Sequence, residues 1–203
     1  VRTDSVLVRF GRDLELPVVA AAWYQLGNAY KKSGQHGEAV KAYQQVVDIT
    51  GVIEDFRSLV QFQIAETRFL QKEYTEAAEE YKKYVRLFPN SEVAGKAFFY
   101  SGWSEFNLKE YETAIATLQE MLEKYPEDRY APDAQFRIAS AHYEMGMYEL
   151  AIDKAQGVLN NFPSSPVIAQ ATYLKANALD QMERDEEAIA AYREVRGLYD
   201  RMF

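Results

Sequence analysis

Hydrophobic and polar residues along this chain follow one pattern that recurs at a fixed interval. In each copy an amphipathic helical stretch ends in an aromatic residue and a proline, and a second helical stretch begins shortly afterwards. The copies lie at 81–102, 118–139 and 155–176, and their prolines, Pro89, Pro126 and Pro163, are 37 residues apart. A fixed period between about 20 and 50 residues is typical of stacked repeats. The pattern therefore predicts an array of helix–turn–helix units.

The predicted first helix of each repeat carries two columns of equivalent residues. The columns are three residues apart and therefore share one helical face. The aromatic column is Tyr24, Phe62, Phe99, Phe136 and Tyr173, and the small column is Gly27, Ala65, Gly102, Ala139 and Ala176. These columns could form a groove of stacked rings that binds an apolar peptide. We favour helix packing instead, because a stacked array needs such packing in every repeat.

The motif Trp23-x-x-Leu26-Gly27-x-x-Tyr30, followed by Ala39 and Tyr43, resembles the tetratricopeptide repeat. The small residue of the second helix recurs in all five repeats, as Ala39, Ala77, Ala114, Ala151 and Ala188. The intervals of 37 or 38 residues are longer than the roughly 34 residues typical of the family. Turns like that at 89–93, with the sequence Pro-Asn-Ser-Glu-Val, accommodate the additional residues. The resemblance covers nearly the whole chain.

The resemblance implies an all-α fold, a right-handed α-α superhelix. We expect a tetratricopeptide solenoid of about five helix–turn–helix repeats plus an N-terminal half-repeat. The expected repeats span residues 17–52, 53–89, 90–126, 127–163 and 164–203. Residues 1–16 are expected to form the second helix of a truncated repeat, ending in a turn at Pro17. Because the chain begins with Val1 rather than Met, we also expect it to be a piece of a longer or processed protein.

Composition argues against several classes of function. The formal net charge of −8 and the absence of a dense basic run argue against a nucleic-acid partner. No apolar run approaches the roughly 20 residues of a membrane-spanning helix. The chain has no cysteine, and its two histidines, His36 and His142, lack neighbours at ligand spacing. We expect no metal, no cofactor and no catalytic site, because no phosphate loop or Ser/His/Asp arrangement is visible.

Residues that vary between repeats carry more functional information than the columns, because packing does not determine them. Trp103 is the main candidate, since a large ring there replaces small or polar residues in the other repeats. Burial of its ring against Phe99 and Phe106 is an equally good alternative. The full set of candidate partner-binding residues is Trp103, Asn28, Glu66, Lys96, Tyr100, Asn107, Arg137, Ser140 and Asn177.

Some tetratricopeptide domains clamp the C-terminal carboxylate of a chaperone through conserved Lys, Asn and Arg residues. Only Asn28 and Lys96 match that set here, and the arginine is absent. We therefore do not expect a carboxylate clamp.

These observations favour a non-catalytic scaffold that binds a peptide or partner domain on its concave face. The long repeat with its Tyr-Pro or Phe-Pro turns is similar to a bacterial envelope subset of the family. That subset includes the lipoprotein scaffold of the outer-membrane barrel-assembly machine and the periplasmic cell-division coordinator. The resemblance implies a periplasmic or outer-membrane-associated location. Three alternatives stay open: a cytosolic co-chaperone or secretion chaperone, the targeting arm of a multidomain enzyme, and self-association through open repeat ends.

Overall fold

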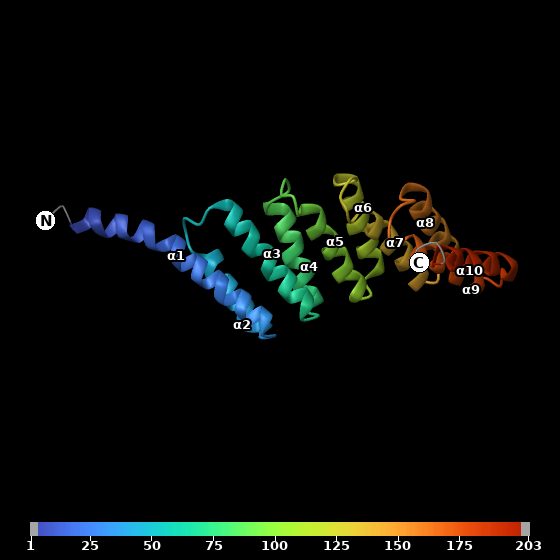
Figure 1. The fold of residues 1–203 in the computed structure, drawn as a ribbon, viewed down its shortest axis with the longest axis horizontal. Helices are drawn as coiled ribbons and strands as arrows, with labels where there is room; N and C mark the ends of the chain where they lie inside the picture. Colours follow the sequence, from blue (N-terminus) through green and yellow to red (C-terminus); the bar gives the residue numbers. More distant parts are fainter. Residues whose placement is uncertain (1–3, 200–203) are drawn as a thin grey trace. The chain divides into compact units, whose positions relative to one another are not determined.

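The computed structural model describes residues 4–199, and side chains from residue 16 to residue 198. This part of the chain contains ten α-helices and no strand. Figure 1 shows their order along the chain. It divides into two compact units, Val1–Ser91 and Glu92–Phe203. Unit 1 contains α1 (Asp4–Lys32), α2 (His36–Asp48), α3 (Glu54–Leu70) and α4 (Tyr74–Leu87). Unit 2 contains α5 (Ala94–Asn107), α6 (Tyr111–Lys124), α7 (Ala131–Glu144), α8 (Tyr148–Asn161), α9 (Ile168–Gln181) and α10 (Asp185–Tyr199).

Consecutive helices pair as hairpins, and each hairpin packs against the next one of its unit. In unit 1, α2 contacts both α1 and α3, and α3 contacts α4. In unit 2 the same order runs from α5 to α10, and the first helices α5, α7 and α9 also contact one another in succession. The predicted all-α architecture of helix–turn–helix units is confirmed.

The turn inside every hairpin has one residue in the left-handed backbone region. These residues are Gly34, Lys72, Lys109, Gly146 and Glu183, with φ between 57° and 77°. In the third hairpin the Lys109 amide donates to the Phe106 carbonyl, and the Glu110 amide donates to the Glu105 carbonyl. This pair of bonds forms a Schellman motif, which ends the helix and satisfies its last carbonyl groups. In the first hairpin this position is Gly34, which adopts the left-handed region without steric cost.

The turns between hairpins have the aromatic-proline geometry that the sequence predicts. Phe88, Tyr125 and Phe162 each end a second helix with φ −132° and ψ between 54° and 57°. The following proline disfavours the helical region for the residue that precedes it, so the helix ends there. The backbone amide three residues later, that of Ser91, Asp128 or Ser165, donates to the aromatic residue's carbonyl and closes the turn.

The small column receives bulky side chains from the second helix of the same hairpin. A Cβ atom on Gly27 would lie 2.5 Å from the Tyr43 ring, and one on Gly102 would lie 2.6 Å from Leu118. Both contacts are shorter than any real Cβ contact, so these positions require glycine. Tyr43 and Leu118 are fully buried as a result. The small column therefore serves packing within each hairpin.

The turn expected at Pro17 is not formed, and this part of the prediction is wrong. α1 is a single helix of 29 residues that continues through Pro17 (Figure 1). The stretch 4–16 is therefore the N-terminal part of α1 and not a separate second helix. Proline removes one helical hydrogen bond and disfavours a helix interior, but it does not forbid it. The alanines at 20–22, which have the highest helix propensity, continue the helix immediately beyond it.

The left-handed turn positions predict a stabilising substitution. A non-glycine residue in this region costs roughly 1 kcal/mol, so Lys109→Gly should raise the free energy of unfolding by about 0.5 to 1 kcal/mol. Lys109→Ala is the matched control, because it removes the same charge and keeps the strained backbone. Urea denaturation followed by circular dichroism measures both. Equal stability of the two variants would contradict the assignment of strain to Lys109.

Candidate functional site

Four aromatic rings of unit 2 form a contiguous group, which we call the aromatic cluster: Phe99, Tyr100, Trp103 and Tyr130. The Phe99 ring stacks on Tyr130 with centroids 5.1 Å apart, and the Tyr100 ring stacks on Trp103 at 5.4 Å. Phe99 and Trp103 join the two pairs at 5.6 Å. Such offset arrangements are typical of aromatic groups that stabilise one another.

Two elements position these rings. Phe99, Tyr100 and Trp103 lie within one turn of α5, and Tyr130 immediately precedes α7. The Asp128 carboxylate accepts a hydrogen bond from the Tyr130 backbone amide at 2.8 Å, which fixes the turn that carries the Tyr130 ring. Gly95 makes room for that turn, because a Cβ atom on it would collide with the Asp128 carboxylate. The cluster therefore depends on α5 and the α6–α7 turn lying close together.

Cationic side chains border the rings. The Arg137 guanidinium lies 4.8 Å from the centre of the Trp103 ring and 5.0 Å from that of Phe106. Lys96 lies 5.7 Å from the Tyr100 ring, and Arg129 lies 4.8 Å from the Tyr130 ring. Cation–π contacts of this kind are strongest where they are shielded from water, as at the half-buried Arg137.

Burial changes the electrostatics beneath the cluster. Burial lowers the pKa of Arg137, and the nearby Asp133 carboxylate opposes this effect. Burial also raises the pKa of Asp133, against a backbone hydrogen bond and the Arg137 charge, which lower it. Asp133 and Arg137, one turn apart on α7, thus attract each other in a partly desolvated region beside the Trp103 ring.

Trp103 is half-buried. It is therefore neither purely a partner-binding residue nor purely a core residue. One part of the ring packs against Phe99, as in the core interpretation, and another part contacts Tyr100 and Arg137. The nearby Asn107 side chain is exposed, and its amide donates to the Trp103 carbonyl at 2.7 Å. The structure therefore brings together five of the candidate residues: Lys96, Tyr100, Trp103, Asn107 and Arg137.

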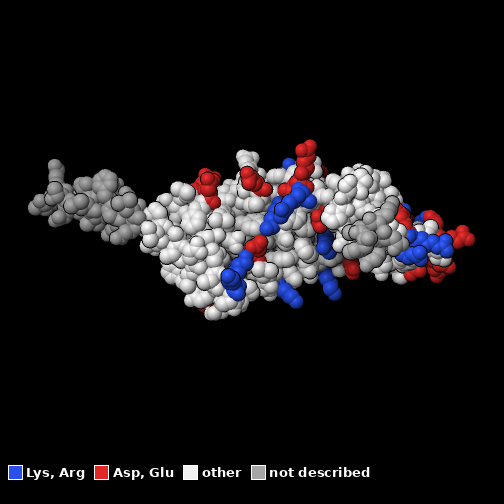
Figure 2. Space-filling model, in the orientation of Figure 1, with Lys and Arg blue, Asp and Glu red and all other residues white. Residues whose placement is uncertain are grey.

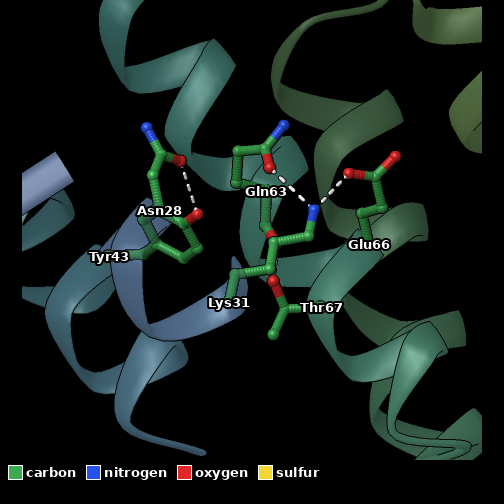
Figure 3. A network of polar contacts seen from close by, with 6 residues as sticks. All are labelled: Asn28, Lys31, Tyr43, Gln63, Glu66 and Thr67. Carbon is green, nitrogen blue, oxygen red and sulfur yellow. Dashed lines mark hydrogen bonds and ion pairs between the residues drawn. The ribbon is translucent and has the colours of Figure 1, made fainter. Parts of the chain in front are cut away.

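Asn28 and Glu66 belong to a separate polar network in unit 1, drawn in Figure 3. The Lys31 ammonium donates to Gln63 at 2.9 Å and pairs with Glu66 at 2.5 Å, which links α1 to α3. The Tyr43 hydroxyl donates to the Asn28 side-chain oxygen at 2.7 Å. These contacts hold neighbouring first helices and the hairpin together; Asn28, Lys31 and Glu66 stay half-buried, whereas Tyr43 is fully buried.

The two other candidates have different surroundings. Asn177 repeats the contact of Asn28, because its side-chain oxygen accepts a hydrogen bond from the Tyr192 hydroxyl at 2.8 Å. Ser140 is buried, and its hydroxyl donates to the Phe136 carbonyl one turn earlier in α7. Because its side chain is buried, Ser140 is not placed to contact a partner.

Tyr130 and Lys31 were absent from the predicted site. Tyr130 has a signal in the sequence, since the equivalent residues of the adjacent repeats are Val93 and Val167. An aromatic residue in a valine column departs from the repeat in the same way as Trp103 does. Lys31 has no comparable signal, and only its contact with α3 identifies it.

Three known protein families match parts of this chain. A family described as outer membrane lipoprotein, YfiO, matches residues 92–201. Tetratricopeptide repeat families match residues 20–49 and 59–91. A search of curated proteins found no significant match.

Solved structures share the fold at low sequence identity. A crystal structure of the MamA protein superposes with a TM-score of 0.70 at 18% identity, covering 87% of this chain and 90% of the other. MamA from Desulfovibrio magneticus RS-1 gives 0.70 at 15% identity, covering 89% and 95%. Tetratricopeptide-like repeats of a putative kinesin light chain from Podospora anserina give 0.68 at 17% identity, covering 90% and 95%. The predicted tetratricopeptide solenoid class is confirmed.

Two observations within residues 4–199 concern a metal site and a membrane-spanning helix. No group of three or more potential metal-ligating side chains is present among the described residues. No helix in this part of the chain combines the length and hydrophobicity that crossing a membrane requires.

Burial of the Tyr43 hydroxyl predicts that the stability of the fold depends on pH. Burial, together with the charges of Tyr24 and Glu66, raises the pKa of Tyr43 to about 12 from its ordinary value of 10.0. Between these pH values the unfolded tyrosine is ionised and the folded one is not, so the free energy of unfolding falls as pH rises. Below pH 10.0 both states hold the proton and this loss is absent.

Tyr43→Phe tests this assignment. At pH 7 the variant should be about 1 kcal/mol less stable, because it lacks the hydrogen bond to Asn28. Above pH 10.0 the difference from the unsubstituted chain should shrink by about 1 kcal/mol, allowing for screening by nearby solvent. Urea denaturation at a series of pH values measures the difference. A gap that is constant from pH 7 to pH 11 would contradict the raised pKa.

Proposed function

The chain belongs to the YfiO family of outer membrane lipoproteins and contains tetratricopeptide repeats, and we propose that it is a non-catalytic scaffold that binds a partner protein in a bacterial cell-envelope complex. The tetratricopeptide repeats themselves imply protein binding, because stacked helical hairpins present a wide and rigid surface. The envelope location rests on the family alone.

The aromatic cluster is the observation that carries the proposed binding site. It lies within residues 92–201, the part that matches the lipoprotein family. Its half-buried Trp103 and Tyr100 are held by neighbouring rings and cations before any partner arrives. Rigid aromatic and arginine side chains dominate binding energy at interfaces, since little side-chain entropy is lost when they bind.

The bordering cations favour a partner segment of a particular chemistry. Lys96 lies over the Tyr100 ring, and Arg129 lies over the Tyr130 ring. An acidic or aromatic side chain of a partner can contact both the ring and the cation at these two positions. On the face shown in Figure 2, charges of both signs are interspersed without a large area of one sign. We therefore propose a peptide or domain that offers apolar and acidic groups together, and not a nucleic acid.

Asn28 and Glu66 in unit 1, and Asn177 in unit 2, are proposed as further partner contacts, each within its own unit. Each keeps exposed surface while a hydrogen bond or ion pair fixes its side chain. Polar groups that are already oriented add specificity at the rim of an interface more than they add affinity.

Trp103→Ala should weaken partner binding by about 2 kcal/mol or more, because it removes the central ring of the cluster. A photo-reactive amino acid at the exposed position 107, beside Trp103, would first capture the partner in the native host, and isothermal titration with the purified partner would then measure affinity. Tyr173→Ala is the matched control, since Tyr173 is an exposed aromatic residue on the first helix α9. Unchanged affinity together with a lower melting temperature would make Trp103 a core residue.

The location has its own test. Fractionation of the native host, with mass spectrometry of the mature N-terminus, should recover the protein from the envelope fraction. Recovery of an uncleaved chain from the cytosol would overturn the envelope proposal and favour a cytosolic co-chaperone.

A further inference from the structure

The apolar face of α1 is uncovered at positions that are covered in later first helices. Its exposed members are Val19, Ala22, Trp23, Leu26 and Ala29. The equivalent residues of three later first helices are all buried or half-buried. They are Arg57, Val60, Gln61, Ile64 and Thr67 on α3, Ala131, Ala134, Gln135, Ile138 and Ala141 on α7, and Ile168, Ala171, Thr172, Lys175 and Ala178 on α9. One face of the repeat is therefore buried in these three hairpins and open in the first.

The element that covers this face elsewhere is the second helix of the preceding hairpin. Val40 and Val47, seven residues apart on α2, pack with the cluster that contains Val60 and Ile64 of α3. On α8, Ile152 and Leu159 occupy the same positions and pack with the clusters that include residues of α9. A short turn joins the covering helix to the covered one, so the two run antiparallel. The open face of α1 thus fits an antiparallel helix with aliphatic residues seven apart.

No described helix of this chain can supply that cover in its own copy. Residues 4–16 form the N-terminal part of α1 itself, so they do not lie against the exposed apolar face of that helix. The last helix, α10, is a poor cover when it comes from another copy. Its residue Arg196 stands where α2 has Val47 and α8 has Leu159, and burying a guanidinium against an apolar face is costly.

The exposed apolar stripe of α1 is complementary to itself. Leu16, Val19, Trp23 and Leu26 follow a 3-4-3 spacing, which is the seam pattern of paired helices. This spacing is symmetric about position 21, so an antiparallel copy places Leu16 opposite Leu26 and Val19 opposite Trp23. Each pair joins two apolar side chains, and Trp23 meets the smaller Val19. A twofold interface requires this kind of self-complementary surface.

We propose that α1 is a self-association surface, on which α1 of a second copy lies antiparallel, in the position that α2 holds on α3 and α8 holds on α9. Val19 and Leu26 of that copy are seven residues apart, as Val40 and Val47 are on α2. The pairing is separate from the aromatic cluster, which lies on α5 and α7. It therefore goes beyond the proposed function and is compatible with it.

A cavity beside the stripe supports this arrangement. The cavity has a volume of about 150 Å³ and is lined by Leu16, Pro17, Ala20, Gly51, Val52, Ile53 and Phe56. Its lining is apolar, and Leu26 of the second copy would lie opposite Leu16 at its edge. A void of about this size accepts an apolar group of the size of a benzene ring. On the face shown in Figure 2, the end of unit 1 that contains α1 and α2 is largely uncharged.

Sedimentation velocity with complementary charge variants tests the proposal. The unsubstituted chain should be dimeric at about 100 µM, and Leu26→Glu and Leu16→Lys should each raise the dimer dissociation constant about tenfold or more. An equimolar mixture of the two variants should form a heterodimer, because position 26 of one copy faces position 16 of the other. Leu87→Glu is the matched control, as Leu87 is also an exposed leucine of unit 1, on α4. Circular dichroism of each variant should show unchanged helix content.

Several results would overturn the antiparallel pairing. One is a monomeric unsubstituted chain at this concentration. Another is a dimer that Leu26→Glu leaves intact or that Leu87→Glu disrupts. A mixture of the charge variants that stays monomeric would exclude the proposed register. Partner binding through Trp103 should be unaffected by Leu26→Glu, so failure of one proposal can be told from failure of the other.

Discussion

The close approach of the two helices in each hairpin is the contact on which the rest of the structure depends. Gly27 and Gly102 leave no space for a Cβ atom beneath Tyr43 and Leu118, and these second-helix residues are completely buried. Once a hairpin is closed in this way, its outer faces are apolar and must be covered by the hairpins on either side. Both the order of the array and the properties of its ends follow from this requirement.

The candidate binding site arises where the chain departs from its own repeat. Trp103 and Tyr130 each replace a smaller residue of their column, and both rings contact Phe99, which Tyr130 reaches because α7 packs beside α5. Packing alone does not require these rings, since the other repeats close without them. Aromatic side chains that exceed the needs of the core, bordered by cations, are a sound basis for a protein-binding surface.

The two ends of the array are treated differently by the chain. At the C-terminal end Arg196 occupies an aliphatic position, which makes the outer face of α10 more polar. At the N-terminal end the stripe that includes Val19 and Leu26 stays apolar and exposed. Polar capping limits association of a repeat array, whereas an open apolar face promotes it.

The sequence by itself determined the features that depend on neighbouring residues. The 37-residue period, the aromatic-proline turns and the small column all follow from local backbone preferences and helical periodicity, and the structure contains each of them. Tertiary structure decided what depends on contacts between distant segments. It placed Tyr130 on Phe99, buried Ser140, and left the α1 face open by continuing the helix through Pro17. These outcomes depend on which helix packs beside which, and no local pattern encodes that.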